Sequence, residues 1–195
     1  MEKEPAFIIG NGLSRKKFKL EKLIGQGCIF GCNALYRDFT PDYLVAIDDK
    51  IIEEITQSDY PMNRFIVPPN EEQYEPAECN PNRPRSNAGM NACFEAIKKG
   101  FKTLYLFGFD FILENEISVK NIYDGTSCYG SETRANYHDN GNRVKYFEYM
   151  AEKNPDVNFK FVVPRDIGII HKINSNNVTG VFYDTFDPEW DSELD

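Results

Sequence analysis

The chain has 195 residues, 41% of them hydrophobic, and a formal net charge of -9 at pH 7. This length is enough for one hydrophobic core and favours one domain over two. The acidic balance argues against a nucleic-acid-binding protein, which needs clustered lysine and arginine, and no apolar run is long enough for stable insertion in a membrane.

Short apolar strands alternate with helical segments along the chain. Strands are expected at 7–9, 28–32, 43–47, 64–67, 103–108 and 159–163, and helices at 16–23, 50–56, 86–99 and 144–153. A Pro-, Asn- and Glu-rich stretch at 68–84 predicts a surface loop. The chain is again polar and irregular from 112 to 142, where 115–138 is expected to form a lid.

These strands are too apolar to have a solvent-facing side, so they indicate a mostly parallel sheet with helices on both faces, a doubly wound α/β fold. We expect one domain over residues 1–183 and an acidic, mobile tail over 184–195. Ligands of such sheets bind beyond the carboxyl ends of the strands. Polar residues follow four of the expected strands: Asn11, Asn33, Asp48 and Asp110.

The first strand runs directly into Gly10-Asn11-Gly12 and then Ser14. Glycines at this point permit positive φ and close approach to an anion, and free amides at a following helix start add positive potential. The segment therefore predicts a phosphate or nucleotide cradle, although an ordinary strand-to-helix turn remains an alternative. Asp48 and Asp110 are likewise either ligands or capping residues.

The five cysteines are Cys28, Cys32, Cys79, Cys93 and Cys128. They form no CxxC pair, and their odd number favours reduced thiols over a disulfide framework, so no zinc or other metal site is expected. The amino terminus also lacks the basic-then-apolar pattern of a secretion signal. We expect a cytoplasmic protein.

Four segments occur in a characteristic order: Gly10-Asn11-Gly12-x-Ser14, Cys32-Asn33, Arg85-x-Asn87-Ala88-Gly89, and residues 100–111. Together they resemble the bacterial α-2,3/2,8-sialyltransferases of glycosyltransferase family 42. In the same register, residues 145–150 resemble the late helix of that family, and His138 falls on its catalytic histidine.

Residues 33–36 and 40–48 are also similar to the DUF115 group, which includes flagellin nonulosonate transferases and an archaeal pterin pyrophosphokinase. The two resemblances together extend discontinuously over residues 6–165. They imply a Rossmann-like fold of the GT-A type.

The resemblance to family 42 implies transfer of a nonulosonate-type sugar from a CMP-linked donor to a hydroxyl of a glycan or another acceptor, without a cofactor. His138 would take the proton of that hydroxyl, because imidazole titrates near neutral pH. Arg85 would stabilise the departing phosphate together with phenol groups. Tyr123, Tyr129 and Tyr137 are the phenol candidates, of which Tyr123 and Tyr137 are assigned to the catalytic set.

The amides of Asn11 and Asn33 would hold the ribose, phosphate or base edge, and the backbone at 87–89 would complete the cradle. The residues assigned to nucleotide binding are Gly10, Asn11, Gly12, Ser14, Asn33, Asp48, Asn87, Ala88, Gly89 and Asp110. Ala88 stands where the sialyltransferases usually have serine, so one hydroxyl is lost. Segment 49–83 is also shorter than in that family, and the acidic tail replaces its membrane-associating part.

Two other functions stay open. The chain could be a non-catalytic nucleotide or nucleotide-sugar binding protein. It could instead be a DUF115-like pyrophosphokinase that uses ATP and Mg²⁺, with the metal at Asp48 and Asp49. A homo-oligomer is compatible with each of these functions.

Overall fold

The computed structural model describes residues 3–114 and 116–190, which contain a seven-stranded sheet. Its strands are β1 (Ala6–Ile9), β2 (Cys28–Cys32), β3 (Tyr43–Val45), β4 (Phe65–Ile66), β5 (Thr103–Phe107), β6 (Asn158–Val163) and β7 (Val178–Phe182). All neighbouring strands pair in parallel. The predicted doubly wound α/β fold is confirmed.

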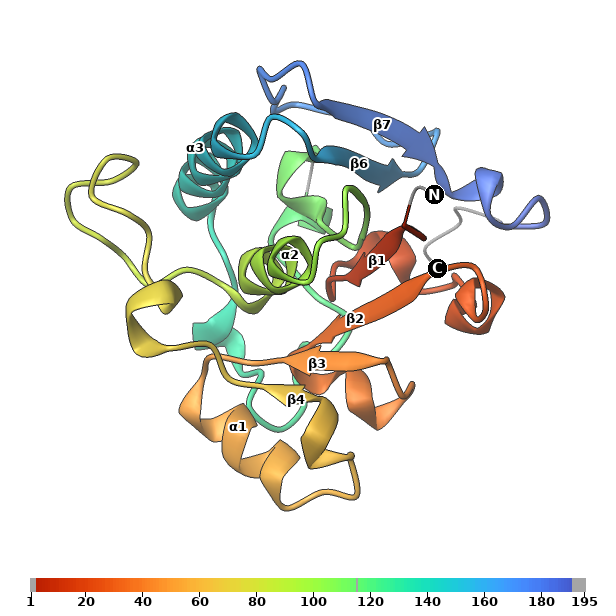
Figure 1. Ribbon diagram of the computed structural model, residues 1–195, viewed down its shortest axis with the longest axis vertical. Coiled ribbons are helices and arrows are strands. Elements are labelled where there is room, and N and C mark those ends of the chain that lie inside the picture. Colours follow the sequence, from red (N-terminus) through yellow and green to blue (C-terminus); the bar gives the residue numbers. More distant parts are fainter. Residues whose placement is uncertain (1–2, 115, 191–195) are drawn as a thin grey trace.

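The strand order is β4-β3-β2-β1-β5-β6-β7, seen in Figure 1 from β7 at the top to β4 near the bottom. The chain starts at the centre, builds outward to β4, and returns to place β5 on the other side of β1. The connection after β1 therefore leads to β2 on one side, and the connection after β5 leads to β6 on the other side. Such a switch point leaves a crevice at the carboxyl ends of the central strands.

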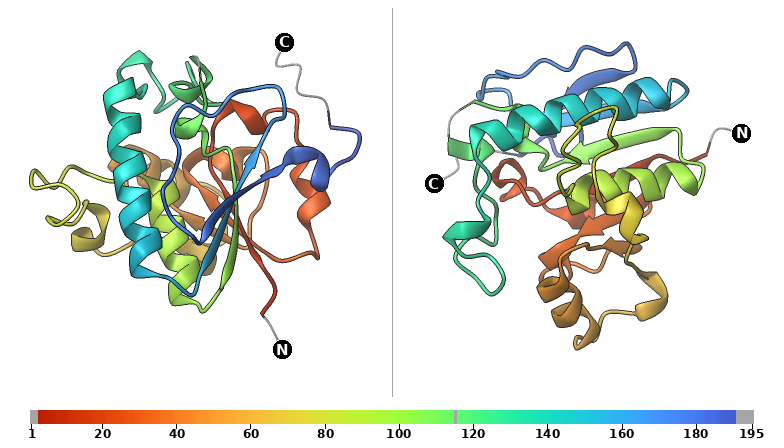
Figure 2. Two further views of the ribbon diagram at one scale, coloured as in Figure 1. Left: turned by 90° about the horizontal axis from the view of Figure 1, so that it is seen from above. Right: turned by 90° about the vertical axis from the view of Figure 1, so that its left-hand side faces the viewer.

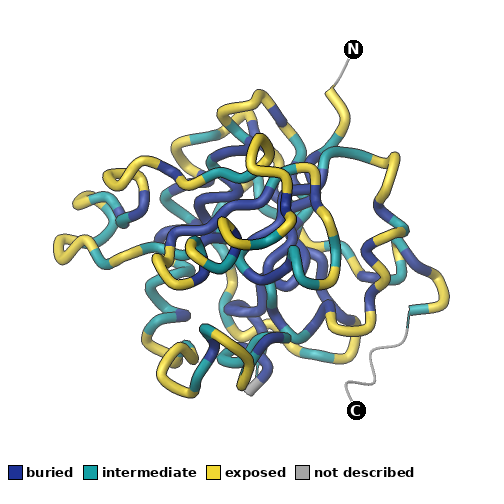
Figure 3. The backbone as a smooth tube through the Cα atoms, turned by 90° about the horizontal axis from the view of Figure 1, so that it is seen from below, coloured by how far each residue is buried: buried dark blue, intermediate teal, exposed yellow. Residues whose placement is uncertain are grey.

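Helices α2 (Ala88–Lys98) and α3 (Tyr137–Lys153) lie side by side on one face of the sheet, as Figure 2 shows from two further directions. Met90 of α2 and Phe147 of α3 belong to the same buried cluster as Ile8 of β1. On the other face, Phe7 packs in a second cluster with Ile55 of α1 (Asp49–Thr56). Successive side chains of β1 point to opposite faces of the sheet, and Phe7 and Ile8 are both buried, so both faces are covered at this strand. Figure 3 shows the buried residues gathered in the interior of the molecule.

Short 3-10 helices complete the structure. Their bounds are Leu13–Arg15, Leu20–Leu23, Asn33–Arg37, Met62–Arg64, Asn70–Gln73, Asp110–Ile112, Glu116–Ser118, Ser131–Thr133 and Tyr183–Thr185. The helix expected at 16–23 is thus represented by separate short turns. Among the described residues, no helix has the length and apolar character needed to cross a membrane.

Helix α3 begins at Tyr137, well before the predicted start at residue 144. A capping box fixes this beginning: the Asp139 backbone N–H donates to Asn136 Oδ1 at 2.8 Å, and the Asn136 N–H donates to Asp139 Oδ2 at 2.9 Å. His138 consequently lies in the first turn of α3 and not in the preceding loop.

The described part of the expected tail is packed against the protein. The Phe186 ring lies 5.2 Å from the Phe107 ring and 5.1 Å from the Tyr105 ring, centroid to centroid. Trp190 stacks on Tyr183 at 4.6 Å, and Asp187 pairs with Lys22 at 2.6 Å. Residues 184–190 therefore differ from the free tail that was predicted, and residues 191–195 lie outside the described residues.

Candidate functional site

A cavity of about 180 Å³ lies at the carboxyl ends of β1, β2 and β5. Its walls include the turn after β1, the end of β2, the start of α2 and the turn after β5. Eight of the ten residues assigned to nucleotide binding line it: Gly10, Asn11, Gly12, Asn33, Asn87, Ala88, Gly89 and Asp110. Ser14 and Asp48 are not lining residues.

The turns after β1 and β5 lie backbone against backbone. The Gly12 N–H donates to the Gly108 carbonyl at 2.9 Å, and a Cβ added at Gly12 would lie only 2.5 Å from that oxygen. Gly10 and Gly12 do not use the positive φ that glycine permits, and the left-handed positions here are Gly108 (+67°) and Asn33 (+52°). Glycine is required at position 12 because the two turns leave no room for a side chain, and not because of its backbone conformation.

Asn11 joins the ends of two strands. Its Nδ2 donates to the Cys32 carbonyl at 2.9 Å, while its Oδ1 accepts from Arg15 Nη2 at 2.9 Å. Arg15 is buried, and its Nε donates to the Gly10 carbonyl at 2.6 Å. Asn11 thus braces the cavity wall and keeps one amide N–H for a ligand.

Asn33 offers an unused acceptor at the cavity. Its backbone is left-handed, which asparagine tolerates better than most residues. Its Oδ1 is buried and accepts no hydrogen bond from the described residues. Because an unpaired buried acceptor is costly, a ligand that brings an O–H or N–H group here would be stabilised.

The start of α2 presents backbone donors to the cavity. Asn87 caps the helix, since its Oδ1 accepts from the Met90 N–H at 3.0 Å. Ala88 and Gly89 line the cavity, and as first-turn residues their N–H groups have no partner within the helix. This position suits a phosphate or carboxylate group.

Asp110 lines the cavity, is buried, and accepts a hydrogen bond from the Ser14 backbone N–H at 2.8 Å. Burial raises its pKa from 3.8 to about 6, with Ser14 and the Arg15 cation acting in the opposite direction. Ser14 is itself buried, and its hydroxyl bonds to the Tyr183 hydroxyl at 2.7 Å. Ser14 is therefore committed to holding the β1 turn against Asp110 and Tyr183.

Asp110→Asn tests this carboxyl through the pH dependence of stability. Folding favours the protonated Asp110, so its contribution is complete below pH 3.8 and is lost as the pH rises through about 6. The asparagine side chain of the variant carries no charge at any pH. The unfolding free energy of the wild type, compared with that of the variant, should therefore fall by about 3 kcal/mol between pH 3.5 and 7, measured by urea denaturation. A difference that stays constant over this interval would contradict the raised pKa.

The catalytic candidates lie outside the cavity lining. His138 is exposed in the first turn of α3, with Nε2 3.4 Å from Asn142 Nδ2. Its helix follows directly on Thr133 and Ala135, which do line the cavity. Arg85 donates to the Ile47 carbonyl and, at 2.7 Å, to Gln73 Oε1, so its guanidinium ties the 73–86 loop to the segment after β3.

The tyrosine candidates are placed differently from one another. Tyr137 is 58% exposed, whereas Tyr123 is buried and its hydroxyl donates to Asp38 Oδ2 at 2.7 Å. Burial, together with that bond, raises the pKa of Tyr123 to about 12. Tyr129 does line the cavity, and burial raises its pKa as well. Asp48 is exposed and is the N-cap residue of α1, but its side chain makes no capping hydrogen bond.

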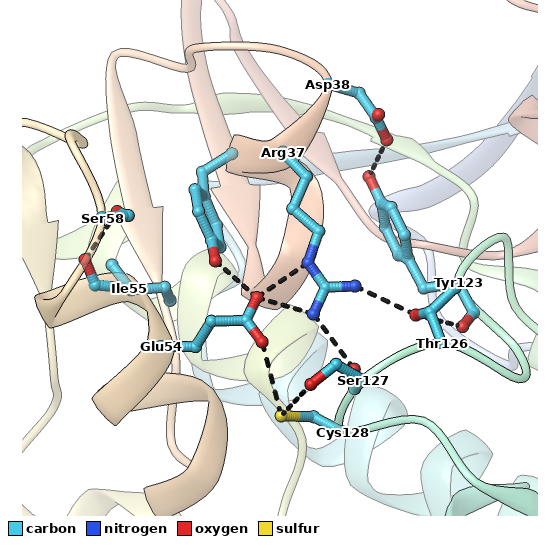
Figure 4. A network of polar contacts seen from close by, with 10 residues as sticks. Arg37, Asp38, Glu54, Ile55, Ser58, Tyr123, Thr126, Ser127 and Cys128 are labelled. Carbon is cyan, nitrogen blue, oxygen red and sulfur yellow. Dashed lines mark hydrogen bonds and ion pairs between the residues drawn. The ribbon is translucent and has the colours of Figure 1, made fainter.

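A polar network holds the segment that carries Tyr123 and Tyr129, as Figure 4 shows. The Arg37 guanidinium donates to Glu54 Oε1 at 2.8 Å, to Thr126 Oγ1 at 3.0 Å and to the Ser127 carbonyl at 3.0 Å. The described part of the expected lid is therefore anchored to the 3-10 helix after β2 and to α1. Asn115, where the lid was expected to begin, lies outside the described residues.

Sequence reasoning missed several cavity residues, among them Lys120, Arg134 and Arg143. Arg134 and Lys120 belong to the irregular segment, where no periodicity indicates which way a side chain points. Arg143 lies in α3, just before the predicted helix start at 144. Its position would have followed from recognising Asn136 and Asp139 as a capping box.

The fold and site define a Rossmann-like α/β protein with a polar, anion-suited cavity at its topological switch point. The MAf glycosyltransferase from Magnetospirillum magneticum AMB-1 is similar in fold, with a TM-score of 0.56 and 14% sequence identity. The alignment covers 100% of this chain and 36% of that one, so this chain spans little more than a third of its length.

Two structures of the sialyltransferase CstII from Campylobacter jejuni align less closely. The complex with CMP-3FNeuAc gives a TM-score of 0.49 and 14% identity over 85% of this chain and 83% of that one. The complex with cytidine-5'-monophosphate gives 0.47 and 16% over 90% and 88%. No family model and no curated protein matches the sequence. At these identities the similarity establishes the fold alone.

Proposed function

We propose that this protein is a glycosyltransferase that takes its sugar from a nucleotide-linked donor, with a CMP-linked nonulosonate as the preferred donor class. One observation carries the proposal. Segments far apart in the sequence that resemble family 42, at 10–12, 32–33, 87–89 and 108–111, all contribute residues to one cavity. The fold shared with the MAf glycosyltransferase is consistent with this activity.

In this proposal the donor lies across the carboxyl ends of β1 and β2. A ribose hydroxyl or a base amine donates to Asn33 Oδ1, the acceptor that has no partner among the described residues. The first-turn amides at Ala88 and Gly89 bind an anionic group of the donor. Asp110, which is ionised above its pKa of about 6, accepts a hydrogen bond from a further hydroxyl of the donor.

Transfer would break the bond between the anomeric carbon and the phosphate oxygen, and the electron pair would leave with CMP. The acceptor oxygen forms the new bond to that carbon and gives its proton to the His138 imidazole. An exposed imidazole in the helix turn that follows the lining residues Thr133 and Ala135 suits an acceptor that arrives from solvent. No metal is needed for this step, because the cavity supplies backbone and cationic groups for the departing phosphate.

Thermal denaturation with a panel of CMP, CDP, UDP, GDP and ATP, with and without Mg²⁺, tests the donor class. CMP at 100 times its Kd should stabilise the fold by about 2.7 kcal/mol, which corresponds to roughly 5–10 °C, and Mg²⁺ should add nothing. A shift that requires ATP with Mg²⁺ would favour the pyrophosphokinase, and no shift with any nucleotide would contradict the proposal.

A non-catalytic nucleotide-sugar binding protein is the second candidate, and the exposed position of His138 outside the cavity lining favours it. The two functions differ in turnover. A glycosyltransferase should release CMP from CMP-sialic acid when acceptor or water is present, whereas a binding protein should return the donor intact. Chromatography of the nucleotide products separates the two outcomes.

A further inference from the structure

Arg143 reaches the cavity from α3 with little of its hydrogen-bonding capacity used. Its one hydrogen bond to the described residues is from Nη1 to Asn140 Oδ1, at 3.3 Å. No carboxylate of the described residues lies within ion-pair distance. A guanidinium has five N–H donors, so most of this group is available to a ligand.

Arg143 is half-buried, and the neighbour to which it donates is held in place. Asn140 is fully buried and is held by its own bond from Nδ2 to the Ser118 carbonyl at 3.1 Å. Burial lowers the pKa of Arg143. The Asp139 and Glu75 carboxylates, which lie beyond ion-pair distance, raise this pKa and so offset part of the effect of burial. Glu75 does not pair with it, and Glu75 Oε2 is itself buried without a partner among the described residues.

Arg134, another cation of the cavity lining, is arranged differently. Its Nε and Nη2 donate to the two carboxylate oxygens of Asp124 at 2.7 and 2.6 Å. Its charge is therefore balanced within the protein. Arg143 is half-buried and has no such carboxylate, and a partly desolvated cation without a paired anion is stabilised by a ligand that supplies one.

We propose that Arg143 is a specificity-determining residue that binds an anionic group of the donor and selects charged nucleotides over neutral nucleosides. The identity of the ligand rests on the function proposed above. A CMP-linked nonulosonate has two anionic groups, the phosphate and the sugar carboxylate. The site has two features for them, the start of α2 and the Arg143 guanidinium, which can bind either oxyanion in a bidentate manner.

Calorimetric titration of cytidine, CMP and CMP-3FNeuAc into Arg143→Gln, Arg143→Lys and the wild type tests this role. Arg143→Gln should weaken binding of the anionic ligand about 10- to 100-fold and change cytidine binding less than about twofold. Arg143→Lys should retain part of the affinity. A loss already seen with CMP identifies the phosphate as the partner, and a loss confined to CMP-3FNeuAc identifies the carboxylate.

Lys145→Gln is the matched control, because it removes one positive charge from an exposed position on the same helix. It should bind all three ligands within about twofold of the wild type. Equal affinities of Arg143→Gln and wild type for every ligand would overturn the proposal. An equal loss for cytidine would also overturn it, because that pattern indicates a structural role.

Inorganic pyrophosphate separates this inference from the proposed function. If the wild type binds no cytidine nucleotide, stabilisation by pyrophosphate that is lost in Arg143→Gln, reduced in Arg143→Lys and kept in Lys145→Gln would support the anion site and reject the donor class. If pyrophosphate and CMP both fail to stabilise the wild type, the anion site is rejected as well.

Discussion

Gly12→Ala is expected to lose about 3 kcal/mol of unfolding free energy and its affinity for CMP, because the new Cβ has no space. It would lie 2.4 Å from the Asp110 carboxyl carbon and 2.5 Å from the Gly108 carbonyl oxygen. The second contact is with backbone, so relief requires the turns after β1 and β5 to separate. These turns form two walls of the cavity. Urea denaturation and calorimetric titration with CMP measure both effects.

Gly141→Ala is the matched control for this substitution. An added Cβ at Gly141, within α3, meets nothing within 4 Å. Alanine should therefore stabilise the helix by about 0.5–1 kcal/mol. If Gly12→Ala were as stable as the wild type and bound CMP equally well, the close packing of the two turns would have no part in forming the site.

His138→Ala is expected to reduce transfer by about 10²- to 10⁴-fold, the usual contribution of a general base. Donor affinity should stay within about twofold, because the imidazole is exposed and does not line the cavity. The loss should therefore appear in kcat and not in the Kd of CMP.

His171→Ala is the matched control, because His171 is the other of the 2 histidines in the chain. His171 follows β6, where its backbone N–H donates to the Ile112 carbonyl at 3.2 Å, a bond that alanine retains. This variant should transfer sugar at the wild-type rate. Transfer at wild-type rate by His138→Ala would remove the histidine from the mechanism and direct the search for a base to Asp110.

The central strands could be predicted because their apolar runs follow from burial on both faces of the sheet. Strand β7 was missed for the opposite reason. It lies at the edge of the sheet, and Thr179, Gly180 and Phe182 are exposed, so its sequence has no continuous apolar run. The packing of Phe186 depends on Tyr105 and Phe107, two rings that lie far away in the sequence, and no local pattern reports it.

The cavity residues that follow strands could be predicted because topology brings strand ends together, as with Asn33 and Asp110. Topology does not say which polar groups are already used. Ser14 and Arg85 have types suited to a phosphate, yet each is committed to other parts of the protein. Arg143 reaches the cavity from a helix on one face of the sheet, and strand order alone does not place it there.

The central claim is that the carboxyl ends of β1, β2 and β5 hold a cytidine nucleotide. A crystal structure of the protein grown with CMP tests it most directly. We expect CMP in the cavity, with a donor group on Asn33 Oδ1 and its phosphate at the start of α2 or on Arg143. A cavity that stays empty at CMP concentrations well above millimolar, or CMP bound elsewhere on the protein, would contradict the claim.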